Sequence, residues 1–377
     1  MHFLQILKEL VSFNTVTPLG LECLKYIENS LKEIGFQVKI LQYGPVHNLF
    51  AKYTGVCNTH ICFAGHVDVV PPSKADWNHD PFNLNINGKS VSGVGVVDMK
   101  GAIACFIDAI KSNIKSVKSS VSIMLTTDEE GDAVDGLKKF IEEDFIKREK
   151  FDLFVLGEPT CSQYAGDAIK VGRRGSVTAI LSIIGRRGHI AYPAFANSVV
   201  QPLSELIALL HNQTIGEDNR YFEKSMVQIT DITTPNSAEN VIPGRMDISF
   251  GIRFNSNYHS SEIVQILSQK IKIICDKYNV GFDITWKQHG EPFYITDENT
   301  MNWLSNHISN VTKIEPHFNT FGATSDGRFL TKLGPVVEIG LEENQAHQNN
   351  ESTTIQNLVM LREIYSRIVL SFHDKNF

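Results

Sequence analysis

The sequence predicts an α/β protein that has helices on the faces of its sheet and a smaller α+β domain inserted into the chain. Helix and strand patterns alternate through residues 1–170 and again after residue 287, as they do in α/β sheets. Three apolar strands in the first of these parts each lead into His, Asp or Glu, at the edge where open α/β sheets place their sites. Residues 171–287 instead show the element order βαββαβ of a ferredoxin-like unit. We therefore expect a discontinuous domain, residues 1–170 and 288–377, around an inserted domain.

The elements of the discontinuous domain follow from hydrophobic periodicity and from turn residues. Apolar residues at helical spacing begin near the N-terminus, Pro18 separates the first two helices, and Gly35 ends the second. Runs of β-branched and aromatic residues bounded by turn residues predict strands. In chain order we expect helices over residues 2–13, 19–35, 101–115, 298–311 and 354–372, and strands over 37–42, 48–53, 60–70, 121–125, 153–156 and 335–340.

The same signals predict six elements in the inserted domain. They are a strand over residues 175–185, a helix over 198–212, strands over 226–232 and 245–254, a helix over 260–278 and a strand over 281–287. This order of elements is the reason for expecting a ferredoxin-like unit.

Composition excludes several classes of function. The chain has 377 residues, 42% of them hydrophobic and 20% charged, and a net charge of −7, so it has no basic field for nucleic acid. Its six cysteines are scattered without a CxxC pair, which indicates free thiols in a reducing compartment. The first residues have helical periodicity and not the pattern of a signal peptide, and no stretch is apolar enough to span a membrane. We expect a cytoplasmic protein that binds neither nucleic acid nor membrane.

The apolar run from Cys62 to Pro71 contains a His and an Asp two residues apart. Side chains at i and i+2 of a strand leave on the same face, so His66 and Asp68 are expected to point the same way. A metal-bound imidazole normally donates its second N–H to a carboxylate, and this pair supplies that arrangement. The alternative is a core strand whose His merely caps a turn.

Further groups of the same kind follow the other strands or lie in late loops. Together with His66 they are Asp98, Glu129, Glu130, Glu158 and His347. Four carboxylates at one sheet edge would raise one another's pKa, and a divalent cation removes that difficulty. Mixed nitrogen and oxygen ligands suit zinc, with cobalt or manganese as substitutes, and two ions about 3.5–4 Å apart are compatible with a bridging carboxylate. The alternative is that these are solvated loop residues.

The motifs around these residues resemble a known family. They are, in chain order, His66-x-Asp68 with Pro71, Asp98-Met99-Lys100-Gly101, Glu129-Glu130-Gly131, Gly157-Glu158-Pro159-Thr160 and His347. In order and spacing they resemble the co-catalytic zinc peptidase and deacylase family, which includes aminoacylases and acetylornithine deacetylase. The match spans nearly the whole chain. It implies a zinc-peptidase-like catalytic domain with a mixed central sheet flanked by helices, and an inserted dimerisation and lid domain that closes by hinges near residues 170 and 287.

The resemblance also implies roles for individual residues around two Zn²⁺ ions per subunit. Asp98 would bridge the ions, His66 and Glu158 would complete the first site, and Glu130 and His347 the second. Asp68 and Glu129 are assigned to catalysis, Glu129 as the general base. His189 and Asn240 would come from the partner's inserted domain to stabilise the oxyanion, so the resemblance implies a homodimer formed through residues 171–287. One departure is Val94, which occupies a position where relatives usually have Arg.

An acidic protein that binds a substrate with several carboxylates needs placed cations, and Arg binds carboxylate bidentately. The substrate-binding candidates are Arg173, Arg174, Arg253, Arg328, Tyr192, Asn240, Ser325 and the backbone at Gly322 and Thr324. The alternative is that the arginines are surface charges and that Tyr192 packs.

The motifs that surround these residues narrow the substrate within the family. They are Gly172-Arg173-Arg174-Gly175-Ser176, Gly188-His189-Ile190-Ala191-Tyr192-Pro193, Asn240-Val241-Ile242-Pro243 and Thr324-Ser325-Asp326-Gly327-Arg328-Phe329. They resemble members that remove a dicarboxylic acyl arm from a diamino acid, so we expect hydrolysis of a linear amide. The alternatives are an acetylornithine deacetylase or general N-acyl amino acid hydrolase, a dipeptidase, and a non-catalytic binding protein that keeps a vestigial metal site.

Overall fold

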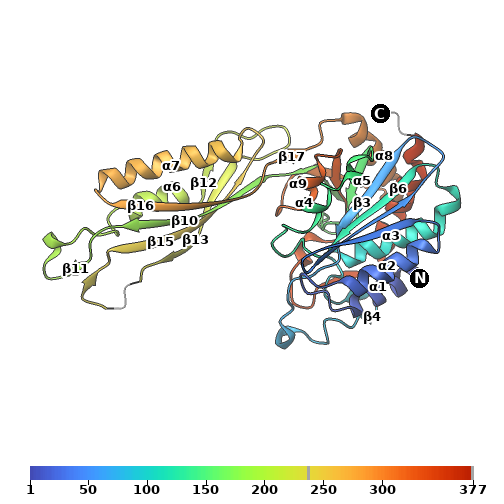
Figure 1. The fold of residues 1–377 in the computed structure, drawn as a ribbon, viewed down its shortest axis with the longest axis horizontal. Helices are drawn as coiled ribbons and strands as arrows, with labels where there is room; N and C mark the ends of the chain where they lie inside the picture. Colours follow the sequence, from blue (N-terminus) through green and yellow to red (C-terminus); the bar gives the residue numbers. More distant parts are fainter. Residues whose placement is uncertain (236–237, 375–377) are drawn as a thin grey trace. The chain divides into compact units, whose positions relative to one another are not determined.

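The computed structural model describes residues 1–235 and 238–374, which form two compact units (Figure 1). The first unit comprises Met1–Gly172, Tyr294–Asn319 and the chain from Ser325 onward, and the second comprises Arg173–Phe293 and Thr320–Thr324. The second unit is thus larger than the expected 171–287, because its last long strand continues to Gly290 and residues 320–324 bind to it. The carbonyl of Phe321 accepts from Arg173, and the hydroxyl of Thr320 donates to the carbonyl of Tyr221. Strands β9 (Gly172–Arg173) and β17 (Phe293–Tyr294) contain two of the points at which the chain passes between the units.

The first unit is built on an eight-stranded mixed sheet, which confirms the predicted fold class. Its strand order is β1-β2-β6-β3-β7-β19-β8-β18. Strands β6, β3, β7 and β19 are consecutive and parallel, whereas β1 and β2 pair antiparallel at one side. The bounds are β1 (Gln37–Tyr43), β2 (Val46–Tyr53), β3 (His60–His66), β6 (Ser120–Thr126), β7 (Leu153–Leu156), β8 (Ala168–Lys170), β18 (His317–Asn319) and β19 (Val336–Glu338).

Strand β3 is the central element, and every residue in it is buried. Such a continuous buried run is typical of a parallel strand covered on both faces. The apolar run predicted a strand that ends at residue 70, but the strand ends at His66. Beyond His66 the backbone leaves the ladder: the Val67 N–H still donates to Thr126, but the Val69 N–H donates to the carbonyl of Thr15.

Four long helices of the first unit pack in series, α1 against α3, α3 against α10, and α10 against α8. Their buried positions recur at helical spacing; in α1 they are Phe3, Ile6, Leu7, Leu10 and Val11. The helices are α1 (His2–Ser12), α2 (Leu21–Lys32), α3 (Lys100–Asn113), α4 (Leu137–Phe140), α5 (Asp144–Lys147), α8 (Glu298–Thr312), α9 (Gly327–Leu330) and α10 (Ile355–Ser371). A separate three-stranded sheet, which the sequence did not predict, consists of β4 (Asn85–Asn87), β5 (Ser90–Ser92) and β20 (Ser352–Thr354).

The second unit contains an antiparallel five-stranded sheet of order β12-β13-β15-β10-β16. Without the short edge strand β12, the order is that of the βαββαβ unit, because the first and last strands, β10 and β16, pair with each other. The elements are β10 (Gly175–Ile184), β11 (Gly188–His189), α6 (Leu203–Leu210), β12 (Gln213–Ile215), β13 (Ser225–Thr233), β14 (Val241–Ile242), β15 (Arg245–Phe254), α7 (Ser260–Lys277) and β16 (Gly281–Gly290).

The core of the second unit lies between one face of this sheet and its two helices. Alternate residues of β15, such as Ile248, Phe250 and Ile252, are fully buried, while those between them are partly exposed. Helix α6 begins at Leu203 and not at residue 198 as predicted, because Pro202 stands at its N-terminus and turns precede it. Within residues 1–235 and 238–374, no helix has both the length and the apolar character that crossing a bilayer requires.

Candidate metal centre

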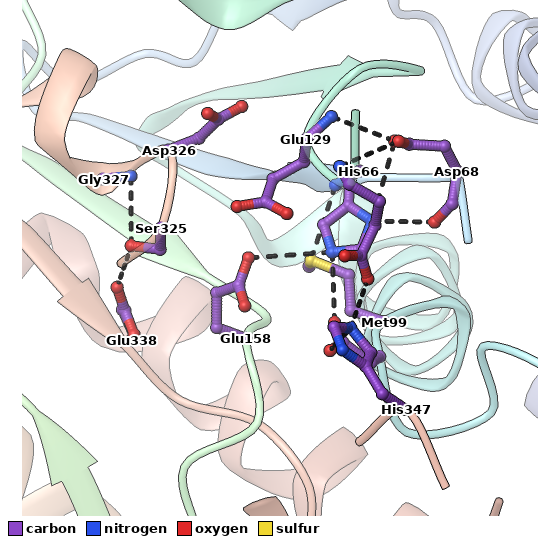
Figure 2. A network of polar contacts seen from close by, with 12 residues as sticks. His66, Asp68, Met99, Glu129, Glu158, Ser325, Asp326, Gly327, Glu338 and His347 are labelled. Atoms are coloured by element: carbon purple, nitrogen blue, oxygen red, sulfur yellow. Dashed lines mark hydrogen bonds and ion pairs between the residues drawn. The ribbon is translucent and has the colours of Figure 1, made fainter. Parts of the chain in front are cut away.

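The centre lies at the carboxyl ends of three neighbouring parallel strands. His66 is the last residue of β3, Glu158 follows β7 by two residues, and Glu130 follows β6 by four. Because β3 lies between β6 and β7, these side chains reach the same sheet edge. Figure 2 shows the side chains of His66 and Glu158 there. Met99 lies beneath them: its side chain packs over Gly65, where a Cβ atom would come within 2.2 Å of the Met99 methyl carbon.

Asp98 lies just before helix α3, and each of its two carboxylate oxygens faces a different imidazole. Its Oδ1 is 3.1 Å from His66 Nε2, and its Oδ2 is 3.4 Å from His347 Nε2. Each imidazole also has a second carboxylate nearby. Glu158 Oε1 is 3.7 Å from His66 Nε2, and Glu130 Oε1 is 2.7 Å from His347 Nε2. The five residues therefore form two groups of three that share Asp98.

The donor set fits divalent metal ions. Two imidazole nitrogens and three carboxylates are the ligand types that Zn²⁺ and its first-row neighbours take in proteins. One ligand atom from each of His66, Asp98 and Glu130 can be chosen so that all three lie within 4.8 Å of one another. Asp98 and His66 are enclosed, at 9% and 1% exposure, and a buried carboxylate normally requires a partner of opposite charge.

Without a cation, these residues neutralise one another. Burial alone would lower the pKa of His66, but the hydrogen bond and the charge of Asp98 raise that pKa well above its usual value. Hydrogen bonds to Asp98 and Glu130 raise the pKa of His347 to about 10. Burial would raise the pKa of Asp98, yet the two imidazolium groups hold it well below its usual range. A metal ion would take the place of these protons.

The structure corrects the expected partner of His66. His66 Nδ1 donates to the backbone carbonyl of Asp68 at 2.9 Å, while the nearer carboxylate oxygen of Asp68 is 3.7 Å away. This bond places the proton on Nδ1 and leaves Nε2 to face Asp98 and Glu158. The Asp68 carboxylate instead accepts from the backbone N–H groups of Glu129 and Glu130, at 3.3 and 3.0 Å. Asp68 therefore orients residues from two strand ends.

Glu129 lies beside the ligands in a half-buried position. Burial, and next the charge of Glu158, raise its pKa well above the usual value for Glu. Figure 2 shows its side chain on the side of His66 away from His347. The charge of His66 acts in the opposite direction and lowers this pKa.

His189 and Asn240 belong to the second unit and lie together there. Strands β11 and β14 pair His189 with Val241, and Asn240 Nδ2 is 3.3 Å from His189 Nε2. His189 is exposed, as is Tyr192 at 64%. The short antiparallel pair β11 and β14 thus places the motif that contains His189 beside the motif that contains Asn240.

The predicted arginines differ in how they are held. Arg173 is buried, and its guanidinium donates to the backbone carbonyls of Phe321 and Ala323 at 3.1 and 3.0 Å. It therefore shapes the backbone around Gly322. Arg253 donates to Ser176 Oγ at 2.8 Å, and burial lowers its pKa.

The remaining predicted substrate residues lie on both sides of the boundary between the units. Gly322 and Thr324 belong to the second unit, whereas Ser325 and Arg328 belong to the first. Arg328 donates to the carbonyl of Ser325 at 3.2 Å, and its guanidinium carbon is 4.4 Å from the centre of the Phe329 ring. The Ser325 hydroxyl donates to the buried carboxylate of Glu338 (Figure 2).

Two buried carboxylates near the centre were not predicted. Asp326 is 2% exposed, and its charge contributes to the raised pKa of Glu129. Glu351 is 3% exposed and accepts hydrogen bonds from the backbone around Asp98. Asp326 lies within the motif Thr324–Phe329. For Glu351, the sequence indicated no role beyond its position four residues after His347.

Val94, which departs from the pattern that the family resemblance implies, is enclosed in this chain. Val94 is 3% exposed, and its N–H donates to the carbonyl of Pro81 at 2.8 Å. The turn that leads to Asp98 is therefore held here through its backbone, and the valine side chain adds apolar packing.

Fold and ligand set together define a metal-dependent hydrolase. The profile described as Peptidase family M20/M25/M40 matches residues 62–371. Among curated relatives, a succinyl-diaminopimelate desuccinylase of Pelagibacter ubique (strain HTCC1062) is 36% identical and the match covers 97% of each chain. One of Rickettsia rickettsii (strain Sheila Smith) is 38% identical, with 98% of this chain and 99% of the relative covered. The chain belongs to peptidase family M20/M25/M40.

Solved structures share the fold at low sequence identity. A tripeptidase from Staphylococcus aureus superposes with a TM-score of 0.81 at 16% identity, with 99% of this chain and 98% of that chain covered. A dinuclear metal binding peptidase of the M20 family from Bacillus subtilis superposes with a TM-score of 0.72 at 16% identity and the same coverage. The chain thus has a fold that is found among solved peptidases.

Proposed function

We propose that the protein hydrolyses N-succinyl-LL-2,6-diaminopimelate to succinate and LL-2,6-diaminopimelate, a step of lysine and peptidoglycan precursor synthesis. The observation that carries this proposal is the division of the Asp98 carboxylate between two His–Glu groups, at 3.1 and 3.4 Å from the two imidazoles. That arrangement supports amide hydrolysis with two ions. The substrate follows from the relatives that share 36% and 38% identity over nearly the whole chain.

Two zinc ions would be held by the five residues described above, His66 and Glu158 on one side of Asp98 and Glu130 and His347 on the other. Cobalt and manganese accept the same nitrogen and oxygen donors and are expected to substitute. When bound, such ions act as Lewis acids on a carbonyl oxygen and bring the pKa of a water towards about 7.

Glu129 is the residue that moves protons. Its carboxylate accepts a proton from the attacking water, whose oxygen forms a bond to the amide carbon. As the C–N bond breaks, the same carboxyl group returns the proton to the leaving amine. Asp68 holds the backbone of Glu129 through the bond to its N–H, so the carboxylate is presented from a fixed turn. A positioned acid–base group of this kind contributes about 10²–10⁴ in rate.

His189 and Asn240 of a second copy would complete the site by donating to the oxyanion. The support for this step is that the two side chains lie 3.3 Å apart on one exposed ladder and belong to the inserted unit. The active form would therefore be a homodimer through residues 171–287, and a donor of this kind contributes about 10²–10³ in rate.

The substrate carries a carboxylate on its succinyl arm and carboxylates on its amino-acid ends. Arg253 and Arg328, with Tyr192, Asn240 and Ser325, are the side chains we assign to these ends. Arg173 acts at one remove in this proposal, since it holds the carbonyls on either side of Gly322 and thereby places the N–H groups of Gly322 and Thr324. Arg is suited to such ends because its planar fork binds carboxylate bidentately.

We place the enzyme in the cytoplasm. All six cysteines are free, and five of them are buried among other side chains. Free thiols of this kind are typical of a reducing compartment.

The test is amide hydrolysis by zinc-loaded protein with N-succinyl-LL-diaminopimelate and N-acetylornithine at equal concentration, with EDTA as the control. We expect clear preference for the succinyl compound and loss of turnover with the chelator. Preference for the acetyl compound would keep the metal centre and overturn the substrate. Turnover of neither compound, together with cleavage of a dipeptide, would identify a peptidase.

A further inference from the structure

Glu351 is a buried carboxylate that is not one of the five proposed metal ligands. It binds the turn that leads to Asp98. Its Oε1 accepts from the N–H groups of Val97 at 2.6 Å and Asp98 at 3.0 Å, and its Oε2 accepts from Gly95 N–H at 2.7 Å. Three N–H groups that converge on one carboxylate form charge-assisted hydrogen bonds, which are stronger than neutral ones. This carboxylate therefore fixes the backbone from which the shared ligand projects.

The same residue belongs to the segment that presents His347. The backbone carbonyl of Glu351 accepts from Gly93 N–H at 3.1 Å, and the following residue begins β20, which pairs with β5. His347 lies four residues earlier, with a positive φ of 58°. Glu351 thus joins two loops, one that carries the shared ligand and one that carries a ligand of a single ion.

We infer that Glu351 is a positioning residue of the metal centre, which orients Asp98 so that its two carboxylate oxygens are divided between His66 and His347. The inference rests on the proposed function and deepens it. A group behind a ligand sets the ligand's direction, and removing such a group costs about 10–100-fold in metal affinity or activity. Because Asp98 is shared, a change in its direction weakens both ion sites together.

If Glu351 served only to hold the loop in place, its replacement would change the two zinc affinities in a different way. If Glu351 only shaped the loop around His347, its replacement would weaken the site formed by His347 and Glu130. The site formed by His66 and Glu158 would keep its affinity. The number of ion sites that are affected therefore separates the two roles.

The experiment compares metal-free wild-type protein with Glu351→Gln in zinc titrations against a competing chelator. Gln keeps the length of the side chain but replaces one acceptor oxygen with an NH₂ group that faces a backbone N–H. Glu342→Gln is the matched control. Glu342 is also buried in the first unit and accepts from Thr353 and Asn357, but it does not bind the Asp98 turn. Circular dichroism and thermal unfolding of each variant report whether it folds.

We expect both zinc affinities of Glu351→Gln to fall by about 10–100-fold while Glu342→Gln binds as wild type does. The cobalt absorption spectrum of the variant should change at both sites, and excess zinc should restore the catalytic rate with little change in KM. Unchanged affinity, or loss at one site alone, would overturn the inference. A wild-type protein that binds no zinc would instead overturn the proposed function.

If Glu351→Gln does not fold, Glu351→Asp replaces it in the titration. Asp keeps the charge but is one methylene shorter, so it cannot reach all three N–H groups, and weaker binding of both ions would again support the inference. Failure of both variants to fold, with Glu342→Gln stable, would show that the carboxylate serves the fold and would overturn the positioning role.

Discussion

Two pairs of functional side chains, one in each unit, lie in opposite physical settings, although His347 of the first unit is exposed and Arg173 of the second is buried. In the first unit, His66 at the end of β3 and Asp98 just before α3 are almost fully enclosed, and their charged groups face each other. In the second, His189 and Tyr192 are exposed on and beside a two-residue ladder. Enclosure suits groups that must keep a fixed geometry around an ion, because buried charges need permanent partners. Exposure suits groups that must reach a substrate or a second chain.

The largest effect is expected at Asp98, the enclosed residue of the first unit that we propose both ion sites share. Asp98→Asn replaces one of the two oxygens with an NH₂ group and removes the negative charge, so one His–Glu group loses its third ligand and the other keeps only a neutral amide oxygen. We expect loss of both ions and a fall in kcat/KM greater than the ~10⁴-fold that removal of a general base can cause. Metal content by atomic absorption and turnover by product release are the measurements. Retention of two ions would show that Asp98 does not bridge.

The second prediction separates proton transfer from metal binding within the first unit. Glu129→Gln keeps the size of the side chain but removes the group that accepts a proton, so turnover should fall by about 10²–10⁴-fold with two ions still bound. Glu130→Gln is the matched control at the next residue. Because Glu130 lies 2.7 Å from His347, this control should lose an ion as well as activity. Substantial turnover by Glu129→Gln would remove it as the base.

The third prediction concerns the second unit. His189→Ala should lower kcat by about 10²–10³-fold without changing the metal content, because the side chain belongs to the other unit. His211→Ala is the control, since His211 is also exposed in this unit, where its Nδ1 lies 3.2 Å from the side-chain amide of Gln228. Metal loss in His189→Ala would break the division between the two units.

A mixing experiment extends this prediction to the dimer. Heterodimers of His189→Ala and Glu129→Gln chains contain one site with both an intact base and an intact His189 if the site is shared. We expect part of the wild-type activity to return in such heterodimers. No recovery in heterodimers verified by mass would indicate a site that is complete within one chain.

The strand-end residues were predictable, and their surroundings were not. His66, Glu130 and Glu158 follow apolar strands whose boundaries are visible in the sequence, and parallel strands bring them to one edge. The partner of His66 was misassigned because β3 ends at His66, so the alternation rule no longer applied to Asp68. Local patterns also gave no sign of Glu351, because its three partners lie more than 250 positions away in the chain.

The second unit shows the same limit. Its element order was visible from periodicity, and strand pairing agrees with it. The return of residues 320–324 to this unit was not predicted, because Arg173 binds the carbonyls of Phe321 and Ala323, a contact between distant parts of the chain that no local signal encodes. Sequence motifs therefore named the residues to which we assign the chemistry, while the residues that contact them from distant parts of the chain were found only in the structure.

The smallest effect we expect is a pH dependence confined to the first unit. In the metal-free protein, His347 has a pKa of about 10, raised by its bonds to Asp98 and Glu130. Because the folded pKa lies above the usual value of 6.5, this ion pair stabilises the metal-free protein fully below about pH 6.5 and loses its effect as the pH rises through 10.

Zinc requires the neutral imidazole, so binding must displace this proton at pH 7. Zinc affinity should therefore rise between pH 6 and 8, with at least about one proton released per protein, measured by calorimetry in buffers of different ionisation enthalpy. His189→Ala should release the same number of protons, because His189 belongs to the other unit, whereas affinity that does not vary with pH would mean that the imidazole is already neutral before the metal binds.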